Sequence, residues 1–121
     1  MELVKIKNIL DQKHLLRELS KKKSRYSKLI LNNADSNLIK AICESLLNVL
    51  EGKVFLEDSD RARLKKYKFV LRELIKKGAL KSKKNILVQK GGSILPFFLP
   101  SVLQTLTQVV GDIISKRNEV H

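Results

Sequence analysis

The side chains with the clearest chemical potential are the lysines and arginines between residues 61 and 90. This segment holds twelve basic residues against one acid, Glu73, so it carries +11 of the chain's net charge of +13. Ammonium and guanidinium groups gathered on one surface neutralise nucleic-acid phosphates and release condensed counterions, which gives salt-sensitive binding that is largely independent of base sequence. A polyanion or an anionic surface is therefore the first partner to consider.

A second basic cluster lies between residues 13 and 28, where seven cations stand against one acid, Glu18. Lysine outnumbers arginine across the chain, nineteen to six. Point-like ammonium charges favour contacts with backbone phosphates, whereas bidentate reading of guanine needs arginine. Alternatively, such a run of charged residues is a solvent-exposed surface that serves only to keep the protein soluble. The residues predicted to bind nucleic acid are Lys21, Lys22, Lys23, Arg25, Lys28, Arg61, Arg63, Lys65, Lys66, Lys68, Arg72, Lys76, Lys77, Lys81, Lys83, Lys84 and Lys90.

Residue types that support catalysis or metal binding form no recognisable constellation in the sequence. His14 lies in the basic region, His121 is the last residue, and Cys43 falls on a helix face that we expect to be buried. No Cys-His pair and no metal-ligand spacing is therefore predicted. The acids of residues 57–60 suit the positive end of a helix dipole better than a calcium loop, which needs a turn glycine and a distal glutamate. We expect a non-enzymatic protein with no catalytic residue, metal or cofactor.

The elements that position these cations are predicted to be helices. Aromatic residues make up 5% of the chain and tryptophan is absent, and apolar residues recur at intervals of three and four. This pattern favours an all-α bundle of four to six helices with a basic face. Apolar stripes predict helices over residues 3–20, 36–51 and 60–77. Asp35 or Ser36 is expected to cap the helix at 36–51, whose broad apolar surface suits a central position.

The chain changes character near residue 90, because the twenty-one residues from Gly91 to Gly111 carry no charge. Gly91-Gly92 is predicted to be a hinge between a helical basic domain, residues 1–90, and an apolar C-terminal segment, residues 91–121. Pro96 and Pro100 are expected to prevent a regular helix over residues 93–99. The amphipathic helix predicted beyond Pro100 could close the core of the same domain, pack on a partner protein or insert into a membrane interface.

The sequence around this junction is similar to that of a known family. Residues 86–100, ILVQKGGSILPFFLP, follow a lysine-rich stretch and resemble small basic virion proteins of Polinton (Maverick) elements and adintoviruses, and more distantly the adenovirus core protein X. Such proteins combine a basic segment with Gly-Gly-x-Leu-Pro and an apolar tail. The resemblance covers about residues 60–115. This chain departs from the adenovirus pattern in its preference for lysine, in its predicted helices and in the extra residue Ser93.

The resemblance implies a minor virion component that neutralises and condenses genome DNA and is encoded by a virus or an integrated viral element. It would place the condensing role on Lys76, Lys77, Lys81, Lys83, Lys84 and Lys90. Since the first five residues do not begin a secretory signal, the expected location is the virion and the host nucleus.

DNA is the expected partner, bound without sequence preference, together with a capsid protein and further copies of the chain joined through the C-terminal segment. The first alternative is a helical interaction or adaptor module that self-associates through that segment. The second is a membrane-active virion peptide, for which the neutral polar face of the last helix is a poor match.

Overall fold

The computed structural model describes the backbone of residues 6–119 and the side chains of residues 6–111. This part of the chain is all-helical and contains no strand, which confirms the predicted all-α class. It folds into eight α-helices and one 3-10 turn, namely α1 (Ile6–Asp11), α2 (Lys13–Leu19), α3 (Ser27–Asn32), α4 (Ser36–Leu50), α5 (Asp58–Lys65), α6 (Lys68–Ile75), α7 (Leu80–Ile94), η1 (Leu95–Phe97) and α8 (Leu99–Glu119).

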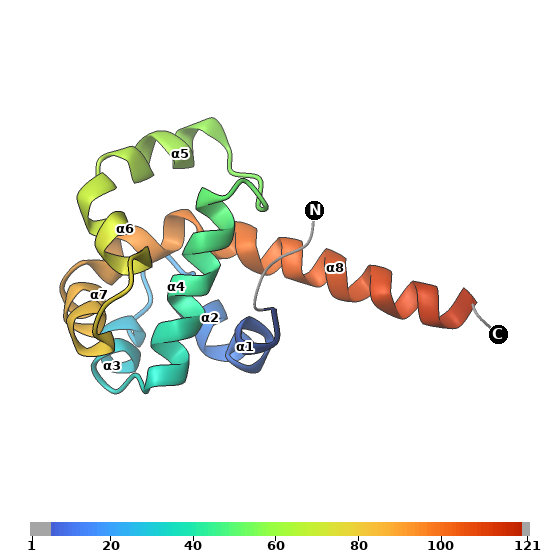
Figure 1. Cartoon of the computed structure of the whole chain (residues 1–121), viewed down its shortest axis with the longest axis horizontal. Coiled ribbons are helices and arrows are strands. Elements are labelled where there is room, and N and C mark those ends of the chain that lie inside the picture. The colour runs from blue at the N-terminus through green and yellow to red at the C-terminus, as the bar shows by residue number, and fades with distance from the viewer. Residues whose placement is uncertain (1–5, 120–121) are drawn as a thin grey trace.

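Helix α4 lies at the centre of the bundle (Figure 1). Its start matches the prediction, because the Asp35 side chain accepts a hydrogen bond from the Leu38 backbone N–H at 2.9 Å and so satisfies one free donor of the first turn. Ile42 and Leu46 are fully buried. Helices α1, α6, α7 and α8 all contact α4, while α3 packs on α7 and α2 packs on α8.

The count of eight helices exceeds the expected four to six because two of the predicted helices are broken. The helix expected over residues 3–20 is interrupted at Gln12, and the helix expected over residues 60–77 is interrupted at Lys66 and Tyr67. At the second break the chain turns so that Leu64, on α5, and Leu74, on α6, both reach the core. Helix α5 contacts η1, whereas α6 contacts α4 and α7, so one straight helix would not serve both sets of neighbours.

The predicted hinge at Gly91-Gly92 is wrong, since both glycines lie inside α7. Gly91 is buried, and a Cβ atom placed on it would lie 2.8 Å from Cδ1 of Leu31 on α3. A side chain at this position would therefore require the Leu31 side chain to shift. Gly92 faces open space, with nothing within 4 Å of a Cβ atom at that position.

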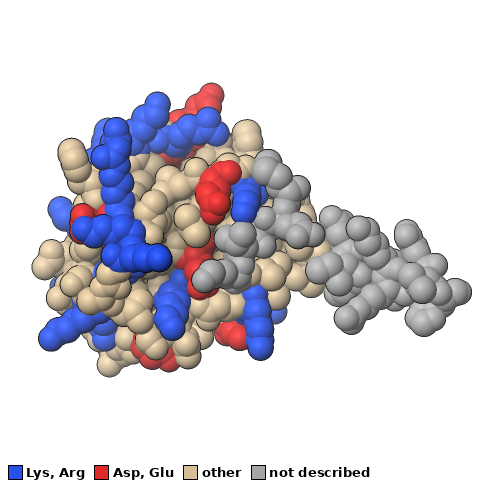
Figure 2. All heavy atoms as spheres, viewed as in Figure 1, with Lys and Arg blue, Asp and Glu red and all other residues tan. Residues whose placement is uncertain are grey.

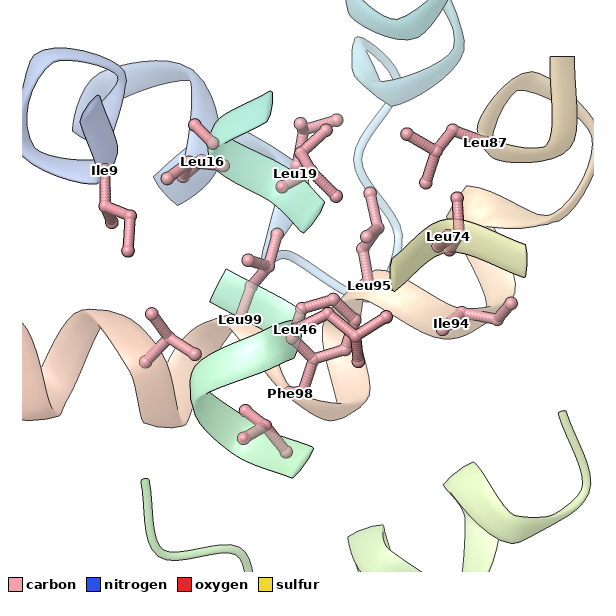
Figure 3. Packing of buried hydrophobic residues seen from close by; sticks show 14 of the residues in the cluster. Ile9, Leu16, Leu19, Leu46, Leu74, Leu87, Ile94, Leu95, Phe98 and Leu99 are labelled. Carbon is pink, nitrogen blue, oxygen red and sulfur yellow. The ribbon is translucent and has the colours of Figure 1, made fainter. Parts of the chain in front are cut away.

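Residues that follow the glycines complete the core of the same bundle. Ile94, Leu95, Phe98 and Leu99 are at most 1% exposed, and Figure 3 shows them among core side chains of α1, α2, α4, α6 and α7. Pro96 lies in η1, so the irregularity expected over residues 93–99 is shorter than predicted. No division of the described residues falls at residue 90, because α7 and the core both continue across it.

Helix α8 leaves the bundle after its first turns. Val102 and Leu106 are buried, and the remainder of the helix leads away from the other elements (Figure 1). Packing on the same domain, one of the three alternatives for this segment, is thus observed up to Leu106. Among the described residues no single helix combines the length and the apolar character needed to cross a bilayer, although the pair Leu80–Phe97 and Leu99–Gly111, bent by 58°, meets those criteria together.

Candidate nucleic-acid interface

The cations of residues 61–90 are distributed over α5, α6, the connector after α6, and α7. Figure 2 shows basic side chains along the upper and left parts of the molecule, with some acidic side chains between them. Ten of the twelve are exposed, namely Arg61, Arg63, Lys65, Lys66, Lys68, Arg72, Lys76, Lys77, Lys81 and Lys90.

Few of these exposed cations are neutralised by a neighbouring acid. In the part of the chain that the structure describes, Arg63 approaches Asp60 at 3.9 Å and Lys76 approaches Glu73 at 2.8 Å, and no other cation of this group forms an ion pair. Exposed pairs of this kind contribute little to stability, so they compete weakly with an added anion. The guanidinium of Arg63 also lies 5.3 Å from the centre of the Phe97 ring, which ties α5 to η1.

Two lysines of the predicted set are drawn into the fold instead. Lys84 is half-buried, and its Nζ donates a hydrogen bond to the Ala34 backbone carbonyl at 3.0 Å. Lys83 is half-buried on α7, which contacts α4, the helix that carries Cys43. Burial raises the pKa of the Cys43 thiol to about 11, while the charge of Lys83 acts in the opposite direction and that of Glu44 in the same direction. Lys83 and Lys84 are therefore poor candidates for contacts with a polyanion.

The second cluster extends from α2 through the following turn to the start of α3. The five cations predicted to bind nucleic acid, Lys21, Lys22, Lys23, Arg25 and Lys28, are exposed, as are Lys13 and Arg17 on α2. Glu18 accepts hydrogen bonds from the Ser24 hydroxyl at 2.6 Å and from Lys21 at 3.1 Å, and these two bonds lower the pKa of the Glu18 carboxyl. Because α3 packs on α7, Lys28 lies on an element that adjoins the first cluster.

A groove that the sequence did not predict lies between the end of α4, the connector over residues 51–57, α5 and α6. Its volume is about 1170 Å³. Buried apolar side chains line it, among them Val54, Leu56, Leu64 and Leu71, and cations border it at Lys53, Arg61, Lys65, Lys68 and Arg72. The sequence feature that could have indicated this groove is the apolar run Val54-Phe55-Leu56. In the structure the exposure of its side chains alternates, so that Phe55 is 79% exposed while its two neighbours are buried.

Within the described residues, no group of three or more His, Cys, Asp or Glu side chains could hold a metal ion. No family model matches the chain, and no curated protein or solved structure matches it either.

Proposed function

We propose that the protein is a non-enzymatic DNA-binding structural protein, a minor virion component of viral origin that neutralises and condenses genome DNA. The observation that carries this proposal is the local excess of exposed cations on α5, α6, their connectors and α7. Ten of the twelve cations of residues 61–90 are exposed, and among the described residues two of the ten form an ion pair with an acid.

The arrangement favours contacts with phosphates over contacts with bases. The exposed cations are mostly lysines, and they lie on short helices and turns that the core holds in place. Neutralisation of the backbone by such charges gives affinity without sequence preference. The resemblance of residues 60–115 to small basic virion proteins supports the same function, and it supports the virion and the host nucleus as locations and a capsid protein as a further partner.

The test is the salt dependence of binding to a short mixed-sequence DNA duplex. The variant Lys66→Gln/Lys77→Gln/Lys81→Gln changes three exposed lysines that lie outside the groove and form no ion pair in the described part of the chain. Since each neutralised phosphate contributes about 0.9 to the slope of log K against log salt, we expect this slope to fall by about 2 to 3.

The control is Lys7→Gln/Lys40→Gln, which removes two charges from exposed positions on α1 and α4, outside both basic clusters. We expect a smaller change in the slope for this variant. Binding that is indifferent to salt, or an equal change of the slope per substituted lysine in the two variants, would contradict the proposal.

A second candidate function is self-association through α8. The buried part of this helix ends at Leu106, whereas Val109 and Val110 are half-buried on the portion that leads away from the bundle (Figure 1). A second copy could cover the side chains of Val109 and Val110. Sedimentation equilibrium of Val109→Gln/Val110→Gln should show fewer oligomers than the unchanged chain, with Thr107→Gln as the control on an exposed position. A chain that is monomeric at every concentration would exclude this function.

A further inference from the structure

The groove beside α5 combines an apolar floor with a cationic border. The floor side chains Val54, Leu56, Leu64 and Leu71 are 4–5% exposed, so they are packed into the bundle on one side and line the groove on the other. Contacts with DNA phosphates would use the border but would leave the exposed apolar side chains at the mouth of the groove in water. The groove therefore has a property that binding of DNA does not explain.

The mouth of the groove exposes large apolar side chains. Phe55 is 79% exposed, Leu50 is 47% exposed and Ile75 is 36% exposed, and all three line the groove. Three large apolar side chains that stay in solvent around one groove are candidates for a surface that another molecule covers. Burial of these side chains would stabilise a complex through the hydrophobic effect.

The charge at the border of the groove is of one sign. Arg61 and Lys65 on α5 face the groove together with Lys68 and Arg72 on α6, and no acidic residue is among those that line it. Lys53 pairs with Glu51 at 3.7 Å, whereas the other four cations form no ion pair within the described residues. An occupant that brings carboxylates to this border would complement it.

We propose that the groove binds an amphipathic helix of a partner protein, whose apolar side chains fill the floor and whose flanking Asp and Glu side chains meet the cationic border. An open groove suits a helix, because the polar outer face of the helix remains in water after docking. The groove volume of about 1170 Å³ has room for several large side chains. A second copy of α8 fits less well, since its residues from Leu99 to Gly111 carry no charge.

One consequence rests on the proposed function. Arg61, Lys65, Lys68 and Arg72 belong both to the groove and to the surface proposed to bind DNA. An acidic helix in the groove would therefore compete with DNA for these four cations.

The probe is a fluorescent synthetic peptide with leucines at positions i, i+3, i+4 and i+7 of a helix and glutamates on both flanks. Its control is a peptide of the same composition with the leucines scrambled. Fluorescence anisotropy with the full chain should show that the amphipathic peptide binds about tenfold more tightly than the scrambled one. Equal affinities of the two peptides would overturn the proposal.

Two exposed phenylalanines supply a matched pair of protein variants. Phe55 lines the groove and is 79% exposed, whereas Phe69 is 80% exposed and is not among the residues that line it. Because both side chains are largely in solvent, we expect both variants to fold, as circular dichroism would confirm. Phe55→Ser should weaken binding of the amphipathic peptide about tenfold, and Phe69→Ser should leave it unchanged. Equal losses in the two variants would count against the groove.

Three further outcomes distinguish a partner helix from a second copy or a membrane, and distinguish the groove proposal from the DNA-binding proposal. An oligomer that Phe55→Ser abolishes, or binding to phosphatidylserine vesicles that depends on Phe55 while the peptide does not bind, would assign the groove to another occupant and overturn the proposal. Peptide binding without DNA binding would support the groove as a site for an amphipathic helix and would refute the proposed DNA-binding function. If DNA binds, a saturating amount of peptide should displace it. Absence of displacement would show that the peptide and DNA do not share the four border cations.

Discussion

Two adjacent glycines on α7 have different roles, although they look alike in the sequence. Gly91 allows α3 to approach α7 closely, while Gly92 lies at the surface. The sequence indicated a flexible joint, because a glycine pair next to prolines commonly breaks a helix. It could not show that Leu31, sixty residues earlier, needs the space of a missing side chain.

The two glycines should respond to alanine in opposite ways. Gly92→Ala should stabilise the protein by up to about 1 kcal/mol, since alanine favours a helix and meets no atom there. Gly91→Ala gains the same propensity but pushes the Cβ atom against Leu31, which is 1% exposed and has little room to move. Overpacking of this kind costs about 1–3 kcal/mol, so we expect net destabilisation. Urea unfolding of both variants would measure the difference, and stabilisation by both would refute the packing role of Gly91.

The thiol of Cys43 should make stability depend on pH in the alkaline range. Burial raises the pKa of Cys43 in the folded state from its ordinary value of 9.0 to about 11, so folding favours the protonated thiol. The unfolded chain loses this proton near its ordinary pKa. The stabilising contribution is therefore complete below about pH 9 and is lost as the pH rises through about 11.

Cys43→Ala removes this titration and leaves the ionisation of the lysines and tyrosines in place. The free energy of unfolding of the unchanged chain, minus that of Cys43→Ala, should therefore fall between about pH 9 and pH 11. A difference that stays constant over this range would mean that the thiol is accessible to water in the folded state.

At the scale of elements, the most predictable helix is the one that combines a cap with a broad apolar surface. Helix α4 was expected over residues 36–51 and is observed over Ser36–Leu50. The breaks that divide α1 from α2 and α5 from α6 carry no glycine or proline, so no local signal marks them. They depend on which neighbours each helix meets, and this is why the groove between α4, α5 and α6 could not be predicted.

The Asp35 cap should contribute measurably to the stability of α4. Asp35→Ala removes the acceptor of the Leu38 N–H bond and should destabilise the protein by about 1 kcal/mol. Asp35→Asn keeps an acceptor oxygen and should cost much less. Urea unfolding of both variants would test this, and an equal loss for Asn and Ala would show that charge, not the hydrogen bond, is what matters.

At the scale of the whole molecule, one core joins residues 6–90 to residues 91–106, which were predicted to belong to separate segments. The sequence alone locates the positive charge at residues 61–90 and the uncharged segment at residues 91–111. Charge patterning does not reveal that residues 94–106 pack between helices from the first half of the chain. In the same way, the sequence identified Lys83 and Lys84 as cations but not their position against α4 and the Ala34 carbonyl.

A single core predicts a single unfolding transition. Phe98 is fully buried and follows the expected boundary, so Phe98→Ala should destabilise the entire bundle by about 3–5 kcal/mol. In the unchanged chain, far-ultraviolet circular dichroism and the fluorescence of Tyr26 and Tyr67 should follow the same denaturation curve. Two separate transitions would indicate that the chain unfolds in two independent units, as the predicted division at residue 90 implies.

The contact between α2 and α8 also has a consequence for synthesis of the chain. Leu16 and Leu19 of α2 are buried in a core that includes Leu99 and Val102 of α8. A ribosome makes the chain from the N-terminal end, so the early helices emerge before the helix that covers them exists. The part of the α2 surface that α8 buries remains uncovered until residues near 100 have been added. The core of the bundle can therefore be completed only after the segment around residue 100 has been synthesised.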